Sequence, residues 1–272
     1  MNGSVRAVER ALEVLSCFEL EHQALSLTQI AEHLRIPKST VFRLLATLEN
    51  KGFVQRQSKT GIYQLGSRLI HLGAVASRMW DVGQWALPHL QRLAAEHGET
   101  VDLAILDGTS VVYLLVVESP QRVKLSAAVG QRLPAWCTAS GKAFLAYLPA
   151  AQVAALTAGG LAKFTPATRT DLDDLNRDLQ ETRERGFALS EQEYEKDINA
   201  VAAPVLNAQW LPVFAMAIAG PSFRLPRERM LALGPVIRAA TETMALEAGM
   251  TALTALASKA AISGLAGRIQ ER

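Results

Sequence analysis

The sequence predicts an α+β protein of two domains. Apolar residues recur at helical spacing through the first part of the chain, whereas from Val101 onward they alternate in short segments separated by turn signals. With 272 residues, 49% of them apolar, the chain is long enough to bury two cores. Strands joined by turns, with helices before and after them, favour an α+β sheet over a doubly wound one.

The chain is predicted to begin with two helices. In residues 5–18 the apolar positions follow one buried helical face, formed by Val8, Leu12, Leu15 and Phe18. Ser26 precedes the second helix as an N-cap, and Gln29 completes a capping box. The side chains predicted to face inward from this helix are Ile30, Ala31 and Leu34.

A third helix and a hairpin are predicted next. The helix starts at Pro37, whose missing N–H is not needed in a first helical turn, and it ends at Gly52. Its apolar face is formed by Val41, Leu44, Leu45 and Leu48. The segments FVQRQ and IYQLG alternate on either side of SKTG and predict the two strands of the hairpin.

Four parts are predicted along the chain. Residues 1–70 form the first domain, 71–87 a linker helix, 88–250 the sheet domain and 251–272 an Ala-rich extension. The linker helix is expected to be continued after Pro88 by residues 90–97.

The sheet domain is predicted from turns and alternation. VDLAILDGTSVVYLLVVES predicts two strands about an Asp-Gly turn, and VKLSAAVG predicts a third. Helices are expected over 141–148, over 172–185 before Gly186, and over 227–248. The uncharged run 198–223 is long enough to cross a membrane, but prolines, a glycine and polar residues interrupt it. It predicts two buried strands joined by a turn, so no membrane association is expected.

The third helix carries polar residues opposite its apolar face. A simply packed helix pair would account for the spacing, but its outer face would usually mix Glu with Lys. Between residues 34 and 72 Glu49 is the only acid among many Lys and Arg. Polar and basic side chains here can reach phosphates and base edges in a major groove, which predicts a winged helix-turn-helix on double-stranded operator DNA. The predicted DNA-binding residues are Thr28, Lys38, Ser39, Thr40, Arg43, Thr47, Arg56 and Lys59.

Composition argues against several other classes. Cys17 and Cys137 are far apart and belong to no metal-binding pattern, so we expect neither a disulfide framework nor a metal site, and no cofactor. A reducing cytoplasm fits this cysteine usage. The N-terminal segment lacks the continuous apolar core of a signal peptide.

Catalysis is the rival interpretation of the sheet domain. All five histidines precede its first strand, and Ala135 replaces the first glycine that a P-loop ending in SGKAF would need. We therefore assign no catalytic residue, and an enzyme would depend on carboxylates with Ser140 and Ser190. Three hypotheses stay open: a ligand-controlled regulator, a small-acid-processing enzyme fused to a DNA-binding module, and a DNA-binding or oligomerisation protein without ligand.

The chain resembles IclR-family transcriptional regulators along most of its length. The resemblance rests, in the family order, on RAVERALEVL, LSLTQIAEHLRIPKSTVFRLLATLENKGFVQR, YQLGSRLIHLG, LPAWCTASGKAFLA, RERGFALSEQEYEKDINAVAAPV and FAMAIAGPSFRL. It implies a winged helix-turn-helix, a linker helix and a GAF-like effector-binding domain with an antiparallel sheet and flanking helices. It also implies a homodimer, or a dimer of dimers (a homotetramer), on a pseudo-palindromic operator.

The resemblance further implies an effector pocket on the concave face of the sheet. Matching positions place around it Leu125, Ala127, Ala139, Ser140, Gly141, Ser190, Glu193, Ile198, Ala200, Ala217 and Ala219. Backbone N–H groups at 139–141 open a helix and are expected to donate hydrogen bonds to a carboxylate. A carboxylic acid is therefore the expected effector.

Three pocket positions depart from the family's pattern. Ala200 stands where many relatives have Cys, and Ala217 and Ala219 stand where some have Ser. The pocket is then expected to be more apolar and to favour a larger or aromatic acid. The alternative is that these alanines only pack in the sheet.

Other positions have two interpretations each. Arg35 and Asp197 replace a usual Gly, which predicts backbone strain; at Arg35 a phosphate contact would accompany it. Glu193 either orients an effector or lies in a solvated loop. Trp136 either stacks on an aromatic effector or packs at a strand end, and packing is favoured.

Overall fold

The computed structural model describes residues 5–18, 23–80 and 82–249. The chain forms two compact units, Met1–Asp81 and Val82–Arg272, and each is described by itself. The predicted extension 251–272 lies outside the described residues.

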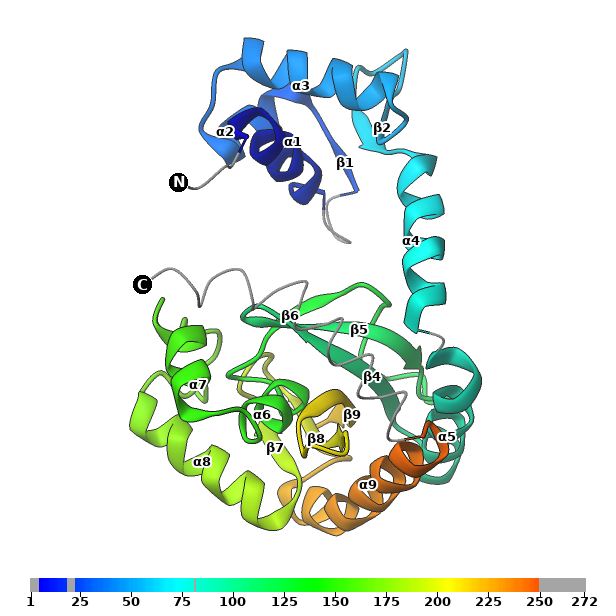
Figure 1. Ribbon diagram of the computed structural model, residues 1–272, viewed down its shortest axis with the longest axis vertical. Coiled ribbons are helices and arrows are strands. Elements are labelled where there is room, and N and C mark those ends of the chain that lie inside the picture. The colour runs from blue at the N-terminus through cyan, green and yellow to red at the C-terminus, as the bar shows by residue number, and fades with distance from the viewer. Residues whose placement is uncertain (1–4, 19–22, 81, 250–272) are drawn as a thin grey trace. The chain divides into compact units, whose positions relative to one another are not determined.

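The first unit combines three helices, a small sheet and a fourth helix (Figure 1). Its elements are α1 (Arg6–Ser16), β1 (Ala24–Leu25), α2 (Leu27–Leu34), α3 (Lys38–Asn50), β2 (Val54–Arg56), β3 (Tyr63–Leu65) and α4 (Ser67–Trp80). The antiparallel sheet has the order β1-β3-β2, which confirms the predicted hairpin and adds the two-residue strand β1. This is a winged helix-turn-helix.

Local signals define the ends of α2 and α3. The Ser26 side chain accepts from the Gln29 backbone N–H and the Gln29 side chain accepts from the Ser26 backbone N–H, so the predicted capping box is present. Arg35 ends α2 with φ 53° and ψ 44°, the left-handed conformation expected from its place at a glycine position. Gly52 follows α3 with φ 76°, where glycine avoids the steric cost.

The buried face of α1 differs from the prediction. Val14, Cys17 and Phe18 enter the core of the first unit, whereas the side chains of Val8 and Leu12 are 55% and 58% exposed. α1 has two adjacent apolar stripes, and α2 and α3 cover only one of them. Spacing along one helix does not indicate which stripe its neighbours will cover.

Helices cover the predicted linker on both sides of Asp81, which lies outside the described residues. α4 ends at Trp80, and α5 (Val82–His97) begins after it. The predicted continuation past Pro88 is present within α5, because a helix can retain a proline at the loss of one backbone hydrogen bond.

The second unit contains a six-stranded antiparallel sheet with the order β6-β5-β4-β9-β8-β7. The strands are β4 (Thr100–Asp107), β5 (Ser110–Val117), β6 (Arg132–Pro134), β7 (Ala188–Glu191), β8 (Ile198–Leu206) and β9 (Pro212–Pro221). The strand predicted in VKLSAAVG is wrong: residues 123–130 are irregular, and β6 pairs with β5 instead. Alternation alone did not supply a pairing partner for that segment.

Helices lie on both faces of this sheet (Figure 1). The helices α6 (Ala139–Leu145), α7 (Ala150–Thr157) and α8 (Leu172–Arg185) belong to one side, and α5 and α9 (Arg227–Glu247) to the other. The Asp171 side chain caps α8, which ends at Gly186 as predicted. Helix α6 begins and ends earlier than expected, and α7 was not predicted.

The uncharged run is confirmed as two buried strands, β8 and β9. Their turn is held by Asn207 Oδ1, which accepts the backbone N–H groups of Gln209 and Leu211. Within the described ranges no helix is long and apolar enough to cross a membrane.

Alternation along β9 gives the two faces of the sheet different character. Ala215 and Ala217 belong to the core cluster under α6, whereas Trp85 of α5 makes an edge contact with Phe214 at a ring-centroid distance of 5.7 Å. Small side chains on the α6 side leave space between the sheet and that helix.

Candidate functional site

Helix α3 presents its predicted DNA-binding residues to solvent. Lys38, Ser39, Thr40 and Arg43 are all exposed, while Val41, Leu45 and Leu48 on the other side are buried in the core. The first three lie in the first turn of α3, and Arg43 lies one turn further on. This exposed surface has the size and chemistry of a helix that enters a major groove.

The wing adds two exposed cations. Arg56 lies at the end of β2, with its guanidinium carbon 5.7 Å from the centroid of the Tyr63 ring, and Lys59 lies in the turn that follows. No carboxylate of the described residues forms an ion pair with Lys38, Arg43, Arg56 or Lys59. Their charge is available to phosphates.

Two of the predicted DNA-binding residues are less available to a DNA partner than the others. Thr28 is half-buried at the start of α2. The Thr47 hydroxyl donates to the Arg43 backbone carbonyl at 2.9 Å, which leaves only its lone pairs for a partner. The sequence reasoning missed Phe42, whose side chain is 53% exposed beside Arg43. Its position off the apolar face of α3 was the signal that could have found it.

The second unit encloses a cavity between the sheet and α6. All predicted pocket residues line it except Gly141 and Glu193. The sequence reasoning missed further lining residues from β4, β5, β6 and the connecting segments: Asp102, Tyr113, Ser126, Gln131, Leu133, Thr138, Tyr194 and Glu195. The cavity has a free volume of about 50 Å³, several times the roughly 10–15 Å³ that a single water needs.

Asp102 is the most unusual group in this cavity. It lies on β4, is 1% exposed, and its Oδ1 accepts a long hydrogen bond of 3.4 Å from Ser140 Oγ. Burial raises the pKa of Asp102 to about 8, and the Ser140 hydrogen bond opposes that shift. The carboxyl is therefore mostly protonated at neutral pH. An acid within the apolar predicted strand VDLAIL was the signal that could have found it.

Gly141 has a packing role. A Cβ at Gly141 would lie 2.1 Å from the backbone oxygen of Ala135 and 2.3 Å from its Cα, so only glycine lets α6 approach this segment. The lining of the cavity comes from the neighbouring Ala139 and Ser140.

Neither Cys137 nor Trp136 lines the cavity. Burial raises the pKa of Cys137 to about 12, and the ionised Glu193 nearby adds to this shift, so its thiol stays protonated and unreactive. Trp136 Nε1 donates to the Ala162 backbone carbonyl at 3.4 Å, and its ring lies 6.1 Å from that of Phe164. Both contacts support a packing role for Trp136.

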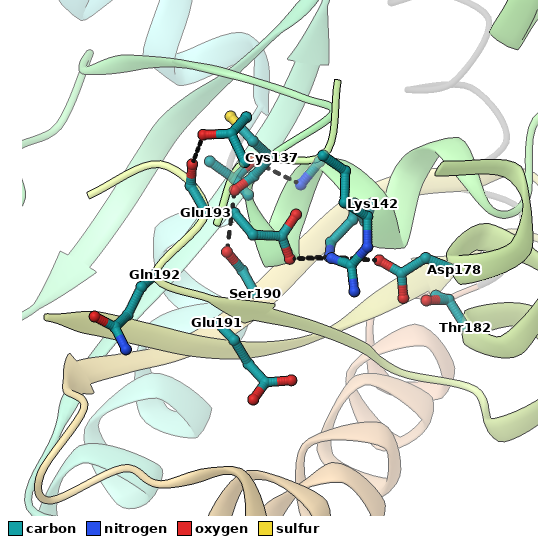
Figure 2. A network of polar contacts seen from close by, with 12 residues as sticks. Cys137, Lys142, Asp178, Thr182, Ser190, Glu191, Gln192 and Glu193 are labelled. Atoms are coloured by element: carbon teal, nitrogen blue, oxygen red, sulfur yellow. Dashed lines mark hydrogen bonds and ion pairs between the residues drawn. The ribbon is translucent and has the colours of Figure 1, made fainter. Parts of the chain in front are cut away.

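Glu193 belongs to a buried ion-pair network behind the cavity wall (Figure 2). Lys142 Nζ lies 2.6 Å from Asp178 Oδ2 and 2.6 Å from Glu193 Oε1, and Arg169 also lies 2.6 Å from Glu193 Oε1. The solvated-loop interpretation of Glu193 is wrong, because the residue is 2% exposed. Its carboxylate is held by two cations.

The backbone beside Glu193 is fixed as well. Thr168 Oγ1 donates to the Glu193 carbonyl, and Thr165 Oγ1 donates to the Gln192 carbonyl at 2.6 Å. Asp197, at the end of this loop, has φ 64°, as expected for a residue at a glycine position. These contacts hold the segment that carries Tyr194 and Glu195 into the cavity wall.

Within the described part of the chain, no group of three or more His, Cys, Asp or Glu is placed to hold a metal ion.

A winged helix-turn-helix with an exposed basic helix, joined in one chain to a sheet unit with a cavity, defines a DNA-binding transcriptional regulator. Comparison with known proteins agrees. The family model described as the IclR helix-turn-helix domain matches residues 7–58, and the model described as bacterial transcriptional regulator IclR C-terminal matches residues 74–246. The chain belongs to the IclR family of transcriptional regulators. These are regulators and not enzymes, which removes the enzymatic hypothesis.

Relatives extend over nearly the whole chain. The HTH-type transcriptional repressor AllR of Klebsiella pneumoniae is 32% identical over 246 residues, which cover 90% of each chain. The crystal structure of an IclR transcriptional regulator from Alicyclobacillus acidocaldarius is 32% identical, with a TM-score of 0.78 over 90% of this chain and 100% of that one. An IclR homologue from Microbacterium hydrocarbonoxydans, solved in complex with 4-hydroxybenzoate, is 25% identical, with a TM-score of 0.74 over 89% of this chain and 100% of that one.

Proposed function

We propose that this regulator binds paired operator half-sites and that a small organic acid, bound in the cavity of the second unit, controls its affinity for DNA. The observation that carries this proposal is the cavity itself: apolar walls enclose a few buried polar groups, including Asp102 and Ser140, in a protein of a DNA-binding family.

On the DNA side, the roles follow from side-chain chemistry. Ser39, Thr40 and Arg43 reach base edges or the groove floor, because they are exposed near the start of α3. Lys38, Arg56 and Lys59 hold phosphates. The phosphate contacts set affinity for any sequence, whereas the α3 contacts set the choice of sequence.

The regulator is proposed to act as a homodimer or a dimer of dimers, so that two copies of α3 read two half-sites. Exposed apolar side chains support self-association of the first unit: Val5 at the N-cap of α1, Val8 and Leu12 on α1, and Ile70, Leu72 and Val75 on α4. A cytoplasmic location, next to the DNA it reads, belongs to the same proposal.

On the ligand side, several observations support an acid. The relative from Microbacterium hydrocarbonoxydans was solved with 4-hydroxybenzoate, an aromatic acid. The methyl side chains of Ala200, Ala217 and Ala219 make their part of the cavity lining apolar. An apolar lining favours an aromatic acid over a small keto acid. The free volume of the cavity in this structure suits a small acid. To admit an aromatic acid, the irregular segment 123–130, which carries Leu125 and Ala127, must move outward.

Control requires that the ligand distinguish two arrangements of the regulator. A ligand that binds both arrangements equally changes nothing, however tightly it binds. The acid is proposed to favour one of them and so to change how well two copies of α3 match the operator.

A gel-shift titration with the chain's own promoter region tests the DNA side. Arg43→Ala is expected to weaken operator binding by roughly tenfold or more, since one good base contact contributes about 1–3 kcal/mol. Arg177→Ala, on the exposed side of α8, is the matched control and is expected to bind as the wild type does. Equal binding by the Arg43 variant would remove α3 as the reading helix.

A thermal-shift screen of organic acids tests the ligand side. An acid that binds the folded chain raises its unfolding temperature through mass action. The same acid must then change operator affinity in the gel shift. Stabilisation by no acid would favour the remaining hypothesis, a DNA-binding protein without ligand.

A further inference from the structure

We propose that Asp102 determines which ligands the cavity accepts, by donating its carboxyl proton to an acceptor oxygen of the bound acid. This inference rests on the proposed function, because it names how the acid is recognised. Asp102 is the specificity-determining residue of this site.

The geometry gives the two oxygens of Asp102 different roles. Ser140 Oγ donates to Oδ1 at 3.4 Å. Oδ2 is buried and has no hydrogen-bond partner among the described residues. A buried polar atom without a partner is costly, and one that lines a cavity gains a partner when a ligand binds there. Since Oδ1 already accepts a hydrogen bond, Oδ2 is the atom that carries the proton.

Among the described residues that line the cavity with Asp102, none is a Lys, Arg or His. The titratable side chains that share the cavity wall with it are Tyr113 from β5 and Tyr194 and Glu195 from the loop before β8. Its register partners on the neighbouring strands, Val116 and Ala217, carry no charge.

The lysine of α6 forms its ion pairs outside the cavity lining. Lys142 follows Ser140 by two positions, but its ammonium contacts Asp178 and Glu193. No Lys, Arg or His is among the residues that line the cavity in the described part of the chain. Burial removes water from the Asp102 carboxylate and so raises its pKa to about 8, and no cation in the cavity lining offsets this.

This arrangement selects ligands by their hydrogen-bonding capacity. A protonated carboxyl donates one short, charge-assisted hydrogen bond to a carboxylate oxygen, and the pair then shares one proton and one negative charge. A carboxylate needs no lysine or arginine in such a site. Above the pKa of Asp102 the proton is lost, and two carboxylates repel each other.

The experiment measures the dissociation constant of benzoate by calorimetry on the full chain from pH 6 to pH 9.5. Benzoate is the main probe because its carboxylate is ionised throughout and it has no phenol; 4-hydroxybenzoate and pyruvate serve as probes of size. The expected wild-type dissociation constant is steady below about pH 8 and then rises about tenfold for each pH unit, as the donating form of Asp102 becomes scarce.

Two variants distinguish the effect of the Asp102 hydrogen-bond donor from the effect of its side-chain shape. Asp102→Asn keeps an N–H donor without titrating, and it is expected to bind within a few-fold of the wild type with no loss at high pH. Asp102→Leu keeps the volume without the donor, and it is expected to bind at least tenfold more weakly at every pH. A cooperative unfolding transition of the second unit, measured by calorimetry, shows that both variants fold. Glu181→Gln, on α8 and outside the cavity lining, has a side chain that is 65% exposed in the wild type; it is the control and is expected to keep the wild-type pH profile.

The outcomes distinguish this inference from the proposed function. If none of the acids binds the wild type, the acid-controlled function falls, and the role of Asp102 falls with it. If benzoate binds but its affinity is independent of pH, or Asp102→Leu binds as tightly as the wild type, only the inference is overturned. Benzylamine tests a ligand of the opposite charge. If this amine bound more tightly than benzoate, and its affinity increased above pH 8, Asp102 would act as an anion and the inference would be overturned. The pH profile of the wild type decides the matter even if a variant fails to fold.

Discussion

The ammonium of Lys142 lies 2.6 Å from Glu193 Oε1, and both side chains are buried, with 0% and 2% of their surface exposed. Lys142 comes from α6 and Glu193 from the loop between β7 and β8, 51 residues later. The contact joins the two segments that carry Ser140 and Tyr194 to the cavity wall. One buried network of polar contacts therefore ties together two segments of the cavity wall (Figure 2).

Removing the Lys142 charge should destabilise the second unit strongly. Lys142→Met leaves Asp178 with weaker and longer contacts to Arg169 and Arg185, and leaves Glu193 with Arg169 alone. The expected loss is about 3–5 kcal/mol of unfolding free energy, because a buried carboxylate loses its partner. Urea unfolding of the full chain measures it.

The matched control for this prediction is an exposed ion pair. Arg177 contacts Asp174 on α8, and its side chain is 74% exposed. Arg177→Ala should cost less than about 1 kcal/mol, since solvent screens such pairs. A Lys142→Met loss as small as that of the control would show that the buried network contributes little.

Gly141 should tolerate no side chain. Gly141→Ala places a Cβ 2.1 Å from the backbone oxygen of Ala135, and backbone atoms cannot move aside as a flexible side chain can. The expected loss is at least about 3 kcal/mol, as for an overpacked core site at the upper end of its range. Calorimetry measures the unfolding temperature of the second unit.

Gly159→Ala is the control for that substitution. A Cβ there meets no atom within 4 Å, and Gly159 does not need a positive φ. Its unfolding temperature should equal or slightly exceed that of the wild type, because alanine restricts the unfolded chain more than glycine does. Similar losses in both variants would contradict the close approach at Ala135.

Asp102 should make stability depend on pH. Its pKa is 3.8 in the unfolded chain and about 8 in the folded one. Between pH 4 and pH 8 the unfolded chain therefore releases a proton that the folded chain keeps, and the free energy of unfolding falls as pH rises. The slope is at most about 1.4 kcal/mol per pH unit.

Asp102→Asn removes this titration and keeps the shape. The variant should gain stability relative to the wild type as pH rises through that window, by a few kcal/mol in total, and the gain should level off above pH 8. Unfolding measured at unit steps from pH 4 to pH 9 tests the sign. A constant difference between variant and wild type would mean that Asp102 ionises normally in the folded chain.

Replacing Arg35 by glycine should raise the stability of the first unit and lower its affinity for DNA. Its φ of 53° is strained for a side chain, so Arg35→Gly should stabilise the first unit by about 1 kcal/mol or less, after the greater freedom of glycine in the unfolded chain is subtracted. The same change removes an exposed cation and should weaken operator binding at low salt. Lys51→Gly, with φ −92°, should give no such stabilisation.

The elements that the sequence predicted best are those with signals inside a few residues. The Ser26–Gln29 capping box and the glycines that follow α3 and α8 each act on the adjacent turn of backbone. The strand at 123–130 failed for the same reason, because a strand needs a partner that its own residues do not specify.

The sequence by itself determined the winged helix-turn-helix, the antiparallel sheet and most of the residues that line the cavity, because capping and alternation are local and the family pattern is collinear. The tertiary structure alone decided which stripe of α1 is buried, that Gly141 touches Ala135, and that Lys142 meets carboxylates 36 and 51 residues away. It also decided the pKa of Asp102. Burial, pairing and proton affinity depend on atoms that distant segments bring to a residue, and no short stretch of sequence contains them.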